Sequence, residues 1–401
     1  MDTITHGIAG ALLGKAMFNG EAMFGSRAMS RARIITWSMM LGAIFPDADV
    51  LRDIFSGNEL LVITWHRSIT HSLLCLPIFA LLLAWITRWL GRWRKWVVPS
   101  FTLLTAIYAA GILSHIFLDL CTSFGTMIWT PLERSRPAWD LLFIIDFTFT
   151  ALLLIPQWLA WAYAQPENLR RRTIGAWLFF LAMPIVVASI GQRAGAAVSE
   201  RGILGAMILI SVFFLLPTVR GWGLRISPAA WNRAGFIAAC VYVGFAIAAH
   251  HAALARVQKF VALEKIDAQS IGALPLPPSL WHWDGLIRAP RGVYELRMDL
   301  SGTTGIMEST AASSEPLEYG FYPEALPNGY IEQAKQLPEV QKVLWFARFP
   351  VTRFHKEGSE AIVEISDLRF RPLHPGRAPS FTYRVRFDAA GKVMSQGWVT
   401  Q

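Results

Sequence analysis

A long apolar run ends with Gly111-Ile112-Leu113-Ser114-His115-Ile116-Phe117-Leu118-Asp119. His115 and Asp119 are four residues apart, so a helix places them on one face, one turn apart. An imidazole nitrogen and a carboxylate oxygen placed in this way can reach the same metal ion. Because burying the two groups without a partner costs roughly several kcal/mol, the stretch predicts a partner for them.

The chain around this stretch is too apolar for an ordinary soluble domain. Its 401 residues are 54% hydrophobic, with a mean hydropathy of +0.39, and the apolar residues fall into long runs. Six runs approach the roughly 20 residues that cross a bilayer: 70–90, 97–119, 140–163, 173–191, 202–217 and 232–254. Two shorter runs, 4–18 and 34–46, fit short, tilted or re-entrant helices. The sequence therefore predicts an all-α polytopic membrane bundle of about six to eight helices.

Charge divides the chain into two parts. Residues 256–401 hold 17 basic and 16 acidic side chains, which leaves 20 basic and 12 acidic side chains for residues 1–255. The positive excess thus belongs to the connections between apolar runs, where it orients helices, and it does not indicate a nucleic-acid surface. The three cysteines give no disulfide framework.

The basic residues also differ between alternate connections. One set of connections holds 14 of them: Lys15, Arg27, Arg31, Arg33, Arg88, Arg92, Arg94, Lys95, Arg170, Arg171, Arg172, Arg220, Arg225 and Arg233. The other set holds six: Arg52, Arg67, Arg134, Arg136, Arg193 and Arg201. By the positive-inside rule the first set is cytoplasmic. We therefore expect a multi-pass protein of the cytoplasmic (inner) membrane, with the N-terminus and everything after residue 254 outside.

The C-terminal part has a different pattern. Tyr294, Leu296, Met298 and Leu300 alternate with charged residues, as in a half-buried strand. Strands are expected at 294–300, 343–351, 361–370 and 381–387, with helices at 255–271 and from Asn328 to Gln336. The predicted organisation is a membrane domain over 1–254 and an extracytoplasmic α+β domain over 255–401.

Histidines and aspartates recur at the outer ends of five apolar segments of the membrane domain. They are His6, Asp47, Asp49, His66, His71, His115, Asp119 and Asp146, the last expected about two turns inside its run. Since one zinc ion takes three or four ligands, this set is large enough for one or two ions. It contains no thiolate, which favours Zn or Mn in a hydrolytic site over a structural zinc.

Other interpretations of the same residues stay open. Asp47 and Asp49 could simply cap the segment after the turn at Pro46, and a lone histidine at a membrane interface commonly bonds to the backbone or a headgroup. Arg67 could bind a substrate phosphate, or it could neutralise Asp47 or Asp49.

Four motifs resemble a known family. The resemblance is to the YdjM-like inner-membrane metal-dependent hydrolases and covers about residues 1–150. The motifs that carry it are Thr5-His6-Gly7, Phe45-Pro46-Asp47-Ala48-Asp49, His66-Arg67-Ser68-Ile69-Thr70-His71-Ser72 and the pair in Ser114–Asp119. A more distant likeness, in the His-x-x-x-Asp ligand pair on a helix, is to zinc-dependent phospholipase C and P1-type nucleases. The resemblance implies a metal-dependent hydrolase and leaves the substrate open.

The first hypothesis is a membrane hydrolase with its metal site at the outer surface, where water with a lowered pKa attacks a phosphoester or lipid-like ester. The expected metal ligands are His6, Asp47, His66, His71, His115 and Asp119. Asp49 or Asp146 would orient a ligand or take a proton, and Arg67 would contact substrate. The expected partners are membrane lipid and a small-molecule or lipid phosphoester, with no nucleic acid. One alternative is a membrane-anchored regulator or assembly factor with a structural metal. A transporter is a weaker alternative, because the sequence shows no repeated halves.

Overall fold

The computed structural model describes residues 1–18, 31–193, 200–219, 221–277, 280–300, 319–371 and 379–399. Of the basic residues named above, Arg27 and Arg220 lie outside the described residues. The chain divides into two compact units. The first comprises Met1–Ala48, Arg67–Trp139 and Ile144–Gly244, and the second comprises Asp49–His66, Asp140–Phe143 and Phe245–Gln401.

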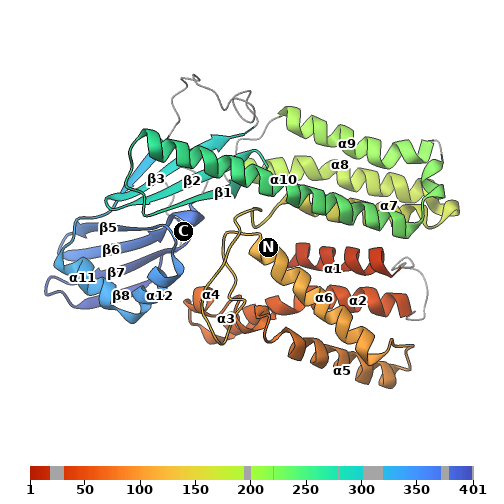
Figure 1. Cartoon of the computed structure of the whole chain (residues 1–401), viewed down its shortest axis with the longest axis horizontal. Helices are drawn as coiled ribbons and strands as arrows, with labels where there is room; N and C mark the ends of the chain where they lie inside the picture. The colour runs from red at the N-terminus through yellow and green to blue at the C-terminus, as the bar shows by residue number, and fades with distance from the viewer. Residues whose placement is uncertain are drawn as a thin grey trace. The chain divides into compact units, whose positions relative to one another are not determined.

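The first unit is helical (Figure 1). Its helices are α1 (Thr3–Met17), α2 (Arg31–Ile44), α5 (Leu76–Arg94), α6 (Phe101–Leu120), α7 (Phe147–Tyr163), α8 (Leu169–Arg193), α9 (Glu200–Val219) and the first part of α10 (Pro228–Leu263). Short 3-10 helices in its connections are η1 (Phe45–Asp49), η2 (Ile69–His71), η3 (Pro166–Asn168) and η4 (Trp222–Arg225).

Several of these helices can cross a membrane. Among the described residues, five helical segments are long and apolar enough: Arg31–Arg52, Phe101–Leu120, Pro166–Arg193, Glu200–Val219 and Pro228–Leu263. The number becomes six if Leu61–His71 and Leu76–Arg94 form one interrupted span. The predicted polytopic bundle is confirmed.

Helix α6 is packed on both sides in the first unit. Its residues Tyr108, Ile112 and Ile116 join a buried cluster with Ile34 of α2 and Ala84 of α5. Glycines allow α2 and α6 to approach closely. A Cβ added at Gly111 would lie 2.6 Å from the carbonyl oxygen of Met39, and one added at Gly42 would lie 3.0 Å from that of Tyr108. This close approach brings the ends of α2 and α6 together.

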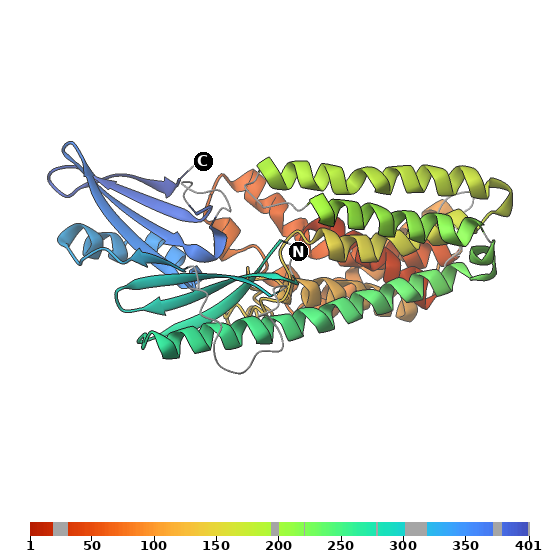
Figure 2. The same ribbon diagram turned by 90° about the horizontal axis from the view of Figure 1, so that it is seen from above.

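Helices α7, α8 and α9 form a second group, seen side by side in Figure 2. Tyr163, Phe180 and Phe214 form its buried core. Helix α7 also meets α1, where Lys15 Nζ donates to Gln157 Oε1 at 2.8 Å. The ends of α1 and α5 and the starts of α2 and α8 lie at one end of the first unit (Figure 1). We call this the basic end, because it carries Lys15, Arg31, Arg33, Arg92, Arg94, Arg170, Arg171 and Arg172.

The second unit holds the strands. The first antiparallel sheet is β1 (Ser270–Leu276), β2 (His282–Ala289), β3 (Gly292–Asp299) and β4 (Tyr319–Pro323) in that order. The second is β5 (Pro350–Glu357), β6 (Glu360–Asp367), β7 (Thr382–Phe387) and β8 (Val393–Trp398), again in order. Its remaining elements are α3 (Val50–Ser56), α4 (Leu61–Thr64), α11 (Gly329–Gln336), α12 (Pro338–Phe346) and η5 (Leu368–Phe370). The expected α+β C-terminal region is confirmed.

The first sheet is buried on both faces within this unit. On one face Trp283 and Leu296 pack with Val257 and Phe260 from the end of α10. The opposite face, which includes Leu286 and Val293, packs with Phe349, Val351 and Leu368. Period-2 alternation in β2 and β3 supplies these two apolar faces.

Two element assignments from the sequence were wrong. The helix expected at 255–271 is the end of α10, which stops at Leu263, and β1 begins at Ser270 because its residues pair with β2. The strand expected at 343–351 is partly helical. Pro338 begins α12, whose residues Val340, Val343 and Phe346 are buried at a spacing of three, and β5 begins only at Pro350.

Candidate metal centre

Four side chains of the first unit converge where α2 and α6 end. Ligand atoms of Asp47, His71, His115 and Asp119 all lie within 4.8 Å of one another, and we call these residues the four-ligand cluster. Asp47 comes from η1, His71 from η2, and the other two from the last turns of α6. Three of them are fully buried, and the Asp47 side chain is 9% exposed.

The separations within the cluster suit a single small cation. Nε2 of His71 lies 3.0 Å from Nε2 of His115 and 3.2 Å from Oδ2 of Asp119. Nε2 of His115 lies 3.4 Å from Oδ2 of Asp119 and 3.4 Å from Oδ1 of Asp47. A tetrahedral zinc with bonds of about 2.0–2.1 Å spaces its ligand atoms roughly 3.4 Å apart. The observed spacing therefore matches the edges of such a site.

The backbone of α2 sets the tautomer of His115. Nδ1 of His115 lies 2.7 Å from the carbonyl oxygen of Ala43, and since a carbonyl can only accept, Nδ1 carries the proton. Nε2 of the neutral ring then presents its lone pair to the cluster. A histidine that ligates a metal is commonly oriented by this kind of hydrogen bond from its second nitrogen.

His71 can adopt the same arrangement. Its Nδ1 lies 3.0 Å from Oγ1 of Thr70, a hydroxyl that can accept from Nδ1–H. Nε2 of His71 then faces the cluster as an acceptor beside Nε2 of His115.

The two carboxylate oxygens of Asp119 have opposite surroundings. Oδ1 contacts the α-amino group of Met1, Nη2 of Arg67 at 3.0 Å and Nε2 of His6 at 3.1 Å. Oδ2 is buried and has no hydrogen-bond donor within the part of the chain that the structure describes. It points instead at the two histidine Nε2 atoms. With His71 in this tautomer, lone pairs converge from three buried atoms, an arrangement that a bound cation stabilises and that is unfavourable without one.

His6 and Arg67 hold Asp119 from the other side. The His6 ring stacks on His115 with centroids 3.6 Å apart, and the fully buried His6 is outside the four-ligand cluster. The Arg67 side chain is 2% exposed, and its Nη1 donates to Oγ1 of Thr122 at 2.9 Å. The sequence left two roles open for Arg67, binding a substrate phosphate or neutralising Asp47 or Asp49. These contacts resemble charge neutralisation, but the carboxylate that Arg67 contacts is Asp119.

One comparison with known proteins gives a match. Residues 1–195 match the family model described as YdjM inner membrane protein. Residues 1–195 belong to the YdjM family. Searches of curated proteins and of solved structures give no match. The YdjM segment contains the whole four-ligand cluster, and the family places the chain in the inner membrane as a multi-pass protein.

Two further predicted residues of the YdjM segment pair with each other. Nδ1 of His66 lies 2.9 Å from Oδ1 of Asp49, and both residues belong to the second unit. Neither is part of the four-ligand cluster. The structure therefore brings together four of the six expected metal ligands, while His6 contacts Asp119 and His115 and His66 is hydrogen-bonded to Asp49.

Asp146 has a different position from the one expected. It is not two turns inside a helix that starts near residue 140, because α7 begins at Phe147 and Asp146 is its N-cap. Its Oδ1 accepts from Phe149 N at 2.9 Å, and its Oδ2 accepts from the Tyr242 hydroxyl at 2.8 Å. This carboxylate is used to start a helix and to bind α10.

Two contributions to the four-ligand cluster were not named from the sequence. The carbonyl of Ala43 orients His115, and Oγ1 of Thr3 donates to Oδ2 of Asp47. A backbone carbonyl has no sequence signal of its own. The contribution of Thr3 could have been found from the sequence, because it is a polar residue at the start of an apolar helix.

Proposed function

We propose that this protein is a membrane-bound metal-dependent hydrolase whose reaction takes place at the four-ligand cluster. The observation that carries the proposal is the bare Oδ2 of Asp119 facing the Nε2 atoms of His71 and His115. Nitrogen and carboxylate ligands without a thiolate are typical of hydrolytic Zn or Mn sites. The cluster suits one ion.

Each residue of the site has a definable task in this proposal. A divalent ion held there would polarise an ester oxygen and lower the pKa of water. His115 is fixed by Ala43, and Asp119 by Arg67 and His6, so the ligands are arranged before an ion binds. Asp47 has the most exposed side chain of the four, which makes it the ligand nearest to entering substrate and the best acceptor for a released proton.

The substrate that we propose is a phosphoester or lipid-like ester, either a membrane lipid or a small molecule. The support is the location of the cluster at the ends of apolar helices in an inner membrane protein. A lipid can reach such a site by lateral diffusion, with its ester bonds near the depth of the helix ends.

One observation favours a second candidate, a structural metal in a regulator or assembly factor. Four protein ligands, three of them fully buried, complete a tetrahedron, as in closed structural zinc sites. A catalytic site keeps one position for water or substrate, so in the hydrolase Asp47 must be displaced or a fifth position must be used.

Purified full-length protein in lipid nanodiscs distinguishes the two candidates. We expect chelation to abolish hydrolysis of aryl phosphomonoesters, phosphodiesters or phospholipids, Zn or Mn to restore it, and His115→Ala to lack it. Stoichiometric metal with no hydrolysis in this screen, together with unfolding on chelation, would instead establish the structural role.

We also propose that the basic end faces the cytoplasm and that the four-ligand cluster and the C-terminal domain face outside. The support is the gathering of arginines and lysines at that end of the first unit (Figure 1). Reporter fusions at Gln401 and in the connection 163–172 test it. A cytoplasmic signal from the Gln401 fusion would contradict it.

A further inference from the structure

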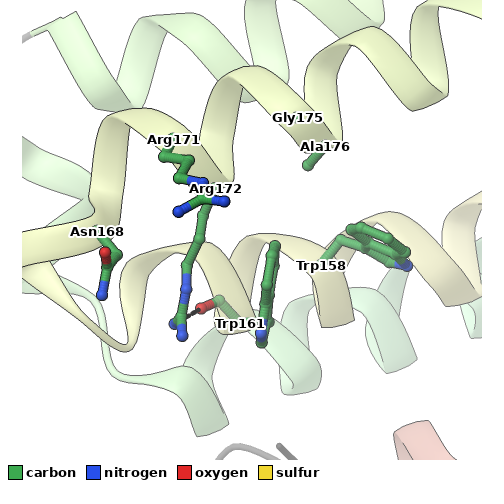
Figure 3. A pocket seen from close by; sticks show the side chains of 7 residues that line it. All are labelled: Trp158, Trp161, Asn168, Arg171, Arg172, Gly175 and Ala176. Atoms are coloured by element: carbon green, nitrogen blue, oxygen red, sulfur yellow. Dashed lines mark hydrogen bonds between the residues drawn. The ribbon is translucent and has the colours of Figure 1, made fainter.

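A cavity of about 520 Å3 opens at the basic end of the first unit. Its lining includes Trp158 and Trp161 of α7 and Arg171 and Arg172 of α8, and Figure 3 shows the Arg172 side chain reaching Trp161. None of the residues around this cavity belongs to the four-ligand cluster. The cavity is therefore separate from the proposed reaction site.

Arg172 is held rigidly in the wall of this cavity. Its guanidinium carbon lies 4.7 Å from the centroid of the Trp161 ring, and its Nη1 donates to the Trp161 carbonyl at 3.0 Å. Its Nη2 donates to Oε1 of Gln165. All of these partners are uncharged, so they position the positive charge and do not neutralise it.

Arg171 adds a second charge. Its exposed guanidinium has no hydrogen-bond or ion-pair partner among the residues described by the structure. Glu167 in η3 is not among the residues that line the cavity, and neither is any other carboxylate. Two neighbouring arginines without an acidic partner suit an anion with several oxygens, such as a phosphate.

The other side of the cavity is apolar. Beyond Gly175 the exposed side chains of Ile174, Leu178 and Phe179 continue along α8, with exposed fractions of 48%, 54% and 44%. A Cβ added at Gly175 would meet no heavy atom within 4 Å, so the space beside it is open. A ligand that fits both sides has an anionic head and an apolar tail.

We propose that this cavity binds the phosphate headgroup of an anionic phospholipid. The phosphate lies between Arg171 and Arg172 at the level of the two indoles, and an acyl chain follows Ile174 and Leu178 along α8. This site does not depend on the proposed hydrolase, and no bond is made or broken in it.

Native mass spectrometry of the full chain in detergent tests the site. The protein is titrated with phosphatidylglycerol, with zwitterionic phosphatidylethanolamine and with inorganic phosphate alone. Arg171→Gln should weaken retention of phosphatidylglycerol roughly fivefold or more, the effect of one basic contact. The matched control is Arg170→Gln, an adjacent exposed arginine that does not line the cavity and should change retention less than about twofold.

A second pair of variants changes shape without changing charge. Gly175→Leu fills the open space and should displace the lipid, whereas Gly205→Leu on α9, which also has open space around it, should not. Three outcomes overturn the proposal: equal effects of the two arginine variants, retention of phosphatidylethanolamine equal to that of phosphatidylglycerol, or equally tight binding of inorganic phosphate alone.

Discussion

The two units of this protein bury carboxyl groups in opposite ways. In the first unit Asp119 directs its bare Oδ2 at the Nε2 atoms of His71 and His115. In the second unit Asp284 and Glu295, which are 7% and 4% exposed, lie on adjacent strands of the first sheet. Donors reach Glu295, whereas Oδ1 of Asp284 is buried and has no hydrogen-bond partner among the described residues.

The donors satisfy Glu295 directly. The hydroxyl of Tyr322 donates to its Oε2 at 2.8 Å, and Nη2 of Arg371 lies 2.6 Å from its Oε1. Burial first, and then the negative charge of Glu295, raises the pKa of Asp284 well above its usual range. A neutral Asp284 carboxyl can donate to Glu295, and an acidic pair that shares a proton in this way needs no external cation.

The difference separates a self-contained acidic pair from a site that needs a cation. Buried carboxylates occur in both units and do not identify a metal site by themselves. The four-ligand cluster differs because Nε2 of His115 faces Oδ2 of Asp119 while its ring proton is directed to the Ala43 carbonyl, and His71 can adopt the same arrangement through Thr70.

The largest effect is expected from His115→Ala. It removes a ligand whose Nε2 lies within 3.4 Å of three other ligand atoms, so bound metal should fall from about one ion per chain to background. Elemental analysis of the purified, folded protein measures this.

His66→Ala is the matched control. His66 is bonded to Asp49 outside the four-ligand cluster, so its variant should keep the metal content of the wild type. Equal metal loss in the two variants would show that the cluster is larger than the four residues. Unchanged metal content in His115→Ala would show that the four-ligand cluster is not the cation site that distinguishes the first unit from the second.

A smaller effect is expected from Gly111→Ala. The added Cβ would lie 2.6 Å from the Met39 carbonyl oxygen, so α6 must move away from α2 and from the Ala43 carbonyl that orients His115. Overpacking of this kind costs about 1–3 kcal/mol, and loss of the orienting bond lowers metal affinity roughly 10–100-fold.

Gly205→Ala on α9 is its control, because an added Cβ there meets no heavy atom within 4 Å. Thermal unfolding and metal titration of the two variants measure the difference. Wild-type affinity in Gly111→Ala would mean that the α2–α6 approach does not position His115.

Much of the membrane part was predictable from the sequence. Long apolar runs give the helices, and the spacing of His115 and Asp119 gives two ligands on one helical face. The strand at β3 follows from the alternation of Tyr294, Leu296 and Met298, and Asn328 caps α11 as expected, accepting from Ile331 N.

The rest depends on contacts between distant segments. Asp146 comes after an apolar run, and only the positions of Phe149 and Tyr242 show that its carboxylate caps α7. The exclusion of His66 from the cluster follows from its bond to Asp49, seventeen residues away. The pattern of α12 was ambiguous because Val343 and Phe346 suit a strand or a buried helix, and tertiary packing decides between them.

The sharpest test of the comparison makes the same chemical change, Asp to Asn, in both units. Its effect on stability in the second unit is the smallest that we expect. In the first unit Asp119→Asn replaces a charged ligand with a neutral amide and should reduce metal content. In the second unit Asp284→Asn replaces the carboxyl whose pKa is raised with a neutral amide that can donate to Glu295, so the fold should be kept.

The raised pKa of Asp284 determines how the stability effect of Asp284→Asn changes with pH. Because the pKa of Asp284 is raised in the folded protein, the folded state binds more protons than the unfolded state between the ordinary value of 3.8 and the raised one. The free energy of unfolding of the wild type therefore falls as pH rises through that window, and Asp284→Asn removes the fall. Hydrogen exchange of β2 and β3 should show the variant equal to wild type near pH 4 (about the unfolded value) and better protected at neutral pH. The control is Asp299→Asn, which should show no such difference because the Asp299 side chain is 51% exposed. If Asp284→Asn is less protected than the wild type at neutral pH, the Asp284 carboxyl is ionised in the folded protein.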